Sequence, residues 1–140
     1  MTQTGLKSGD FRVHGGCETP SGALLVSDNV LRVHRSVDGG ATFRKHRIAK
    51  DTWFEFNGLC CVSPLGGKDV VAAGQKGLIA LSRNDGRTFS LVDHPYGSIA
   101  FSDAVACQGG VYVVGSFARY PLPVRGSTRV EKGIILRFLS

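Results

Sequence analysis

Short apolar runs recur along the chain, separated by segments rich in glycine, serine, asparagine, aspartate and proline. Three of these runs, at residues 23–26, 70–73 and 111–114, have the length and composition of single strands. No stretch keeps the three- and four-residue spacing of apolar positions that marks an amphipathic helix. The pattern therefore predicts an all-β protein in which strands alternate with tight turns.

Two of the turn segments share the octet pattern Ser-x-Asp/Asn-x-Gly-x-Thr-Phe and begin 46 residues apart. Aspartate or asparagine can accept hydrogen bonds from turn amides, glycine can adopt a positive φ, and the hydroxyls can bond across the turn. We expect each octet to close a hairpin, with its phenylalanine as a strand residue packed beneath it. The predicted turn residues are Ser36, Asp38, Gly40, Thr42 and Phe43, and then Ser82, Asn84, Gly86, Thr88 and Phe89.

The rest of the chain extends the repeat. Residues 11–17 align with 54–60, and 99–107 form a looser third copy. Residues 76–81 are echoed by 132–137, after an insertion at roughly 117–131. Self-similarity at this period is typical of repeat architectures. We therefore expect a single domain, 1–140, with units at about 11–53, 54–98 and 99–140.

The two octets and their spacing resemble the Asp-box, or BNR, repeat of sialidases, related lectins and several non-enzymatic propellers. The first copy fits every position, whereas the second has Asn84 where Asp is usual. The resemblance implies a β-propeller-like fold with three four-stranded antiparallel blades. It says little about function, because these turns usually lie on the propeller periphery, away from the ligand face.

The third unit reaches its last residues where an octet should begin, so we expect its blade to be incomplete, without the outermost strand. Residues 1–10 could supply such a strand as a ring-closing or exchanged segment. Three blades are fewer than the roughly four to eight that usually surround a channel. Because an unpaired apolar edge promotes aggregation, we expect strand exchange between chains or cover by another protein.

The chain is basic, with 17 Lys and Arg against 11 Asp and Glu and a formal net charge of +6. One concentration of charge follows the first octet and includes Arg44 and His46. Successive residues of a strand face opposite sides, so this run is either a charged, protected edge strand or a patch for an acidic surface. No nucleic-acid module accompanies it, and we expect no sequence-specific binding to nucleic acid.

A second basic group lies in the insertion of the third unit. Its two prolines make a regular strand improbable, and long loops in compact domains are often functional. Arginine and tyrosine are favoured at binding hot spots, which makes this the leading predicted contact surface. An ordered loop without a binding role is the alternative. The candidate residues are Arg119, Tyr120, Arg125 and Arg129.

The sequence favours neither catalysis nor a cofactor. The arginine triad, the Tyr/Glu nucleophile pair and the acid/base Asp of sialidases have no recognisable counterpart, and we expect no enzyme activity. The histidines show no ligand spacing, and no Cys-x-x-Cys pair occurs, so no metal site is predicted. Small buried thiols are expected at Cys17, Cys60, Cys61 and Cys107, with a disulfide between blades or chains as the alternative.

Two classes of function remain open. The first is a structural or docking module within a homo- or hetero-oligomer, in the manner of Asp-box proteins in phage tails and virions. The alternative is a carbohydrate- or receptor-binding, lectin-like module, for which aromatic platforms are few because Trp53 has no counterpart in the other units. No signal peptide or membrane-spanning run is predicted, which implies a cytoplasmic product on synthesis or a virion-associated one.

Overall fold

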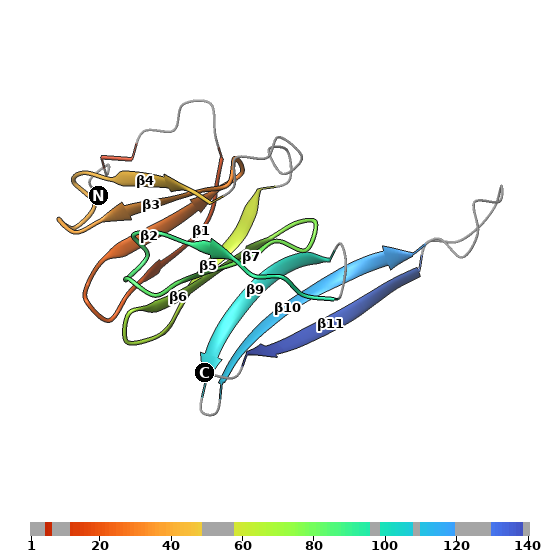
Figure 1. Cartoon of the computed structure of the whole chain (residues 1–140). Coiled ribbons are helices and arrows are strands. Elements are labelled where there is room, and N and C mark those ends of the chain that lie inside the picture. Colours follow the sequence, from red (N-terminus) through yellow and green to blue (C-terminus); the bar gives the residue numbers. More distant parts are fainter. Residues whose placement is uncertain are drawn as a thin grey trace.

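A computed structural model describes residues 5–6, 12–48, 58–95, 99–107, 110–119 and 130–138. These residues form three antiparallel sheets, which follow one another along the chain and do not close into a ring (Figure 1). The all-β prediction is confirmed. None of the described residues lies in a helix that could cross a membrane.

Each sheet is a meander in which consecutive strands pair as neighbours. The first sheet contains β1 (Val13–Glu18), β2 (Leu24–Asp28), β3 (Arg32–Ser36) and β4 (Arg44–Arg47). The second contains β5 (Leu59–Gly66), β6 (Asp69–Gly74), β7 (Ile79–Ser82) and β8 (Ser90–Leu91). The third contains β9 (Ala100–Cys107), β10 (Gly110–Arg119) and β11 (Val130–Phe138). The first strands of the three sheets lie beside one another, with β5 between β1 and β9.

The second sheet is the middle layer, and its inner strand β6 is apolar on both faces. Val70 and Ala72 on β6 pack into a core shared with the first sheet. Val71 and Ala73 alternate with them and pack into a second core, shared with the third sheet. A strand buried on both faces reads as a continuous apolar run, which is why residues 70–73 show no polar alternation.

The third sheet has three strands, and no fourth strand pairs with β11 among the described residues. The insertion predicted at 117–131 is only partly a loop. The ladder of β10 and β11 continues to the pair Arg119 and Val130, so both ends of the insertion are strand. The two prolines lie beyond that pair and therefore interrupt no described ladder hydrogen bond.

The phenylalanines of the octets precede their strands, contrary to the prediction that they are strand residues. The strands begin one residue later, at Arg44 and Ser90. The amide N–H of Phe89 donates to Nε2 of His46 in the neighbouring sheet, at 3.3 Å, instead of joining a ladder. The Phe89 side chain is buried in the first core, and that of Phe43 is half-buried.

The N-terminal segment is anchored on the first sheet at two described points. The N–H of Gly5 donates to the carbonyl of Gly40, in the turn between β3 and β4. The N–H of Arg12 donates to Oδ1 of Asn29, and the N–H of Asn29 donates to the carbonyl of Arg12, at the turn between β2 and β3. The other residues of the predicted ring-closing segment, 1–4 and 7–10, lie outside the described ranges.

Candidate functional site

The first octet forms a turn held by its own side chains, as its composition predicts. The hydroxyl of Ser36 accepts the N–H of Gly40 at 2.8 Å and donates to Oδ1 of Asp38. The carboxylate of Asp38 in turn accepts the N–H and the hydroxyl of Thr42, at 2.9 and 2.5 Å. These bonds, with that of Thr42 first, lower the pKa of the exposed Asp38 carboxyl to about 2.

The second octet repeats this network with one donor reversed. Ser82 accepts the N–H of Gly86 and donates to Oδ1 of Asn84, which also accepts the N–H of Thr88. In the last bond the Asn84 amide donates to the Thr88 hydroxyl at 2.8 Å, whereas the Thr42 hydroxyl donates to Asp38. Asparagine therefore closes the turn with the same connectivity as aspartate.

Both turns pass through the left-handed region at equivalent positions, with φ of +68° at Gly39 and +65° at Asp85. The following glycine of the second turn, Gly86, has a φ of +77° and lies directly against Leu25. A Cβ at this position would lie 2.7 Å from both methyl carbons of Leu25. The second turn is therefore packed onto the first sheet at a place where only glycine fits.

Asp85 binds the second turn to the first sheet. Its carboxylate accepts Nη2 of Arg35 at 2.5 Å and the hydroxyl of Ser21 at 2.6 Å, and its backbone carbonyl accepts Nε of Arg35 at 2.8 Å. Burial raises the pKa of this carboxyl, but the bonds from Ser21 and Arg35 outweigh burial and lower it. The Arg35 guanidinium, with a side chain 14% exposed, is thereby held in one orientation.

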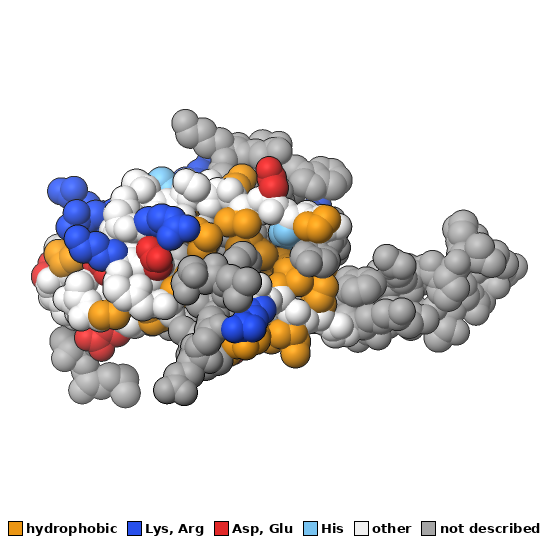
Figure 2. Space-filling view, turned by 60° about the horizontal axis from the view of Figure 1, so that its bottom comes forward, with side chains coloured by type: hydrophobic (Ala, Val, Ile, Leu, Met, Phe, Trp, Pro, Cys, Tyr) orange, Lys and Arg blue, Asp and Glu red, His pale blue; other side chains and the backbone are white. Residues whose placement is uncertain are grey.

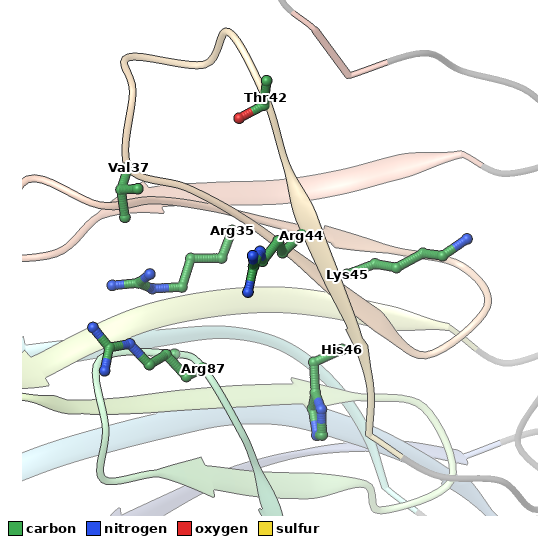
Figure 3. A pocket seen from close by; sticks show the side chains of 8 residues that line it. Arg35, Val37, Thr42, Arg44, Lys45, His46 and Arg87 are labelled. Atoms are coloured by element: carbon green, nitrogen blue, oxygen red, sulfur yellow. The ribbon is translucent and has the colours of Figure 1, made fainter.

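A cleft of about 320 Å³ lies between the two octet turns (Figure 3). Its lining comes from β3, β4 and the two turns and contains no carboxylate among the described residues. In the close view, the guanidinium groups of Arg35, Arg44 and Arg87 gather on one side, while the ammonium group of Lys45 points away from them. The lining residues are Arg35, Val37, Thr42, Arg44, Lys45, His46, Gly86 and Arg87.

His46 enters the same cleft and also contacts the second sheet. Its ring stacks on Phe89 with a centroid separation of 6.2 Å and an interplanar angle of 25°. Because Nε2 accepts the N–H of Phe89, the neutral imidazole carries its hydrogen on Nδ1. His46 therefore lines the cleft and also packs against the second sheet.

Two of the predicted contact residues, Arg44 and His46, thus line the cleft. The backbone of Arg119 lies at the end of β10, while Tyr120, Arg125 and Arg129 lie outside the described residues. Among the described residues, the basic group that contains Arg44 and His46 does not meet the basic group of the insertion. Sequence reasoning missed Arg35 and Arg87. Arg35 could have been found from the sequence, because a hairpin closed by the first octet pairs Arg35 with Arg44.

A buried charged cluster lies on the other face of the first sheet and was also missed. Asp28 is fully buried, and its carboxylate accepts Nε of Arg32 at 2.8 Å and contacts Nε2 of His34 at 2.7 Å. Its other oxygen accepts the amides of Val30 and Arg32. Burial raises the pKa of Asp28, but these bonds, led by that of His34, outweigh it and lower the pKa to about 2.

Cys17, Cys60 and Cys61 are free thiols; Cys61 is buried and the other two are half-buried. Burial raises the pKa of Cys17 to about 11 and that of Cys61 to about 12, and it also raises the pKa of Cys60. Thiols with raised pKa values are poor nucleophiles and metal ligands. The described residues contain no group of histidine, cysteine and acidic side chains that could hold a metal ion.

A scan against protein-family models finds no match to this chain, and searches of curated proteins and of solved structures find none either. The Asp-box resemblance therefore rests on the octets, their spacing and their turn chemistry.

Proposed function

We propose that the chain is a non-enzymatic docking module, a segment of an Asp-box propeller that assembles with a second copy of itself. One observation carries the proposal: the outer face of the third sheet is exposed although the equivalent faces of the other two sheets are buried.

The same sheet face is buried twice within the chain. Leu25 on β2 is buried against the second sheet. Val71 takes the equivalent place on β6, because the residues before Leu25 and Val71 pair with the first serines of the two octets. Val71 is buried against the third sheet. Each sheet thus offers this face to the sheet that follows it.

On the third sheet, the repeat alignment places Tyr112 at this position. Tyr112 lies opposite Val105 of β9 and Arg137 of β11, and Val114 lies opposite Ile135 on the same face. Val105 is 53% exposed and Ile135 is 68% exposed. Burying one such aliphatic side chain fully is worth about 1.5–3 kcal/mol, so a partner sheet on this face would be stabilised.

Hydrophobic side chains also gather in the middle of the face that Figure 2 shows, while Lys and Arg side chains lie at one end of that face and beside the hydrophobic area. An exposed apolar area of this kind is suited to association with another protein surface.

The outer face of the first sheet is partly apolar and partly charged, because Asp28 and His34 lie on it with Leu24 and Val26. Leu24 and Val26 alternate with Leu25 and are half-buried, whereas their equivalents on β6, Val70 and Ala72, are buried against the preceding sheet. The third sheet of one copy can therefore dock on the first sheet of another. This head-to-tail contact, made twice, would close a ring of two chains.

The N-terminal anchor points favour the same arrangement. Gly5 and Arg12 are held on the first sheet, at the turns that end β3 on either side. In the proposed dimer this segment would therefore be close to the docked third sheet of the partner, and it is the candidate for the fourth strand beside β11.

Native mass measured by light scattering tests the proposal. We expect a dimer, which Ile135→Lys dissociates because it places a charge in the apolar interface. Val37→Lys is the matched control, since Val37 is 71% exposed but lies in the first octet turn, away from that face. A sample that lacks residues 1–9 should also be monomeric. A monomeric wild-type chain, or an Ile135→Lys variant with the wild-type mass, would refute self-assembly.

A further inference from the structure

We infer that the cleft between the two octet turns binds a tetrahedral oxyanion, the phosphate or sulfate group of a compact ligand. Three arginines from two sheets line one side of it: Arg35 on β3, Arg44 on β4 and Arg87 in the second turn (Figure 3). Guanidinium groups bind such oxyanions through paired N–H donors, and Arg87 joins the hairpin partners Arg35 and Arg44 from a distant part of the chain.

The charges of the cleft are unbalanced. Arg35 and Arg44 are direct cross-strand partners on one face, an arrangement of like charges that destabilises a sheet. Neither the Arg44 nor the Arg87 side chain has a hydrogen-bonding or ionic partner among the described residues. Asp85 neutralises one of the three positive charges, which leaves a surplus of about two and matches a doubly charged anion.

The cleft is also organised before any ligand arrives. Both Nε and Nη2 of Arg35 bond to Asp85, so the guanidinium is oriented and its Nη1 edge is left for a ligand. Arg87 follows Gly86, which is fixed against Leu25. His46, which also lines the cleft, is held in place by its bond from the N–H of Phe89. A preorganised set of donors loses little conformational entropy on binding.

The size and lining of the cleft restrict the ligand further. Its volume of about 320 Å³ is at the small end of ligand sites and suits one monosaccharide or a free anion. The described lining contains no Phe, Tyr or Trp ring on which bases could stack, as single-stranded nucleic acids require. We therefore favour a free anion or a sulfated or phosphorylated sugar over a nucleic acid.

Titration of ¹⁵N-labelled protein by NMR tests this inference at constant ionic strength. The probes are sodium sulfate, sodium phosphate, a sulfated disaccharide and its unsulfated counterpart. Backbone signals of residues 86–87 and 42–46 should shift and saturate. Arg44→Ala and Arg87→Ala should each weaken binding by about tenfold or more, the usual cost of one charged hydrogen-bonding group. Both side chains are exposed, so the spectra should keep the wild-type fold.

Arg83→Ala is the matched control. Arg83 belongs to the same octet and is 78% exposed, but it pairs with Asp69 and lies outside the cleft. Arg83→Ala should keep the affinity for each probe within about twofold of the wild-type value, as expected for an exposed charge that does not contact the ligand. Tighter binding of the sulfated disaccharide than of sulfate would assign the site to a sugar ester, and equal binding would assign it to the free anion.

Three results would overturn the inference. The first is the absence of saturable shifts with every probe. The second is equal weakening by Arg83→Ala, which would indicate net charge alone. The third is an oligothymidylate that binds more tightly than the disaccharide and is insensitive to Arg44→Ala. None of these results depends on the oligomeric state, so the outcome is separable from the proposed assembly.

Discussion

Replacing Asp28 by Asn tests whether the buried carboxylate stabilises the first sheet. Asp28 is fully buried, and its pKa is lowered from 3.8 to about 2. A depressed carboxyl pKa means that the folded state favours the ionised form. The corresponding stability is complete above the unfolded pKa of about 4 and is lost as pH falls toward 2.

The size of the effect follows from the shift. A difference of nearly two pKa units, at about 1.36 kcal/mol each, gives roughly 2 kcal/mol. Asp28→Asn keeps one oxygen for the amides of Val30 and Arg32 but removes the charge that faces Arg32 and His34. We therefore expect the variant to lose about 2 kcal/mol of unfolding free energy at neutral pH.

Urea unfolding of the wild type and the variant, at a series of pH values from 7 down to about 2, measures this difference. The gap should stay constant to about pH 4 and then close as Asp28 becomes protonated in the wild type. Asp69→Asn is the control: its carboxylate pairs with the exposed Arg83 at 3.3 Å, and removing such a surface ion pair should change the unfolding free energy by no more than about 1 kcal/mol. A difference in unfolding free energy that is the same at pH 7 and at pH 2 would refute the role of the Asp28 charge. A difference that disappears near neutral pH would show that an imidazole, and not the carboxyl, is the titrating group.

Two further predictions concern packing and thiol reactivity. Gly86→Ala should cost about 2–4 kcal/mol of unfolding free energy, because it adds strain at a φ of +77° to a clash with Leu25, whereas Gly39→Ala should cost only about 1 because nothing lies within 4 Å. Thermal unfolding measures both, and equal losses would contradict the packing account. At pH 8, Cys17 should react with iodoacetamide about 100-fold more slowly than an ordinary thiol, and Cys61 more slowly still, because burial raises their pKa values from 9.0 to about 11 and 12. Mass spectrometry of native and urea-unfolded samples reports these rates, and native labelling at the unfolded rate would show that the thiols are accessible.

Local chemistry made the turns and the central strands predictable. The octets specify their own hydrogen bonds, since each acceptor lies within four residues of its donor, as in Asp38 and Thr42. The apolar run at 70–73 predicted a buried strand for a similar reason, because burial on both faces leaves no polar position. The structure of the insertion at 117–131 was harder to predict from the sequence, because β10 continues to Arg119 only by pairing with Val130 of β11.

The sequence by itself determined a repeated all-β chain: the period of the units, the turn that each octet forms and the strands on either side. Only the tertiary structure decided which faces meet. The bond of Asp85 to Arg35 joins residues 50 apart, and the convergence of Arg44 and Arg87 depends on how one sheet is placed against the next. Such contacts leave no local pattern, because the side chains that meet are selected by sheet register and packing rather than by neighbours along the chain.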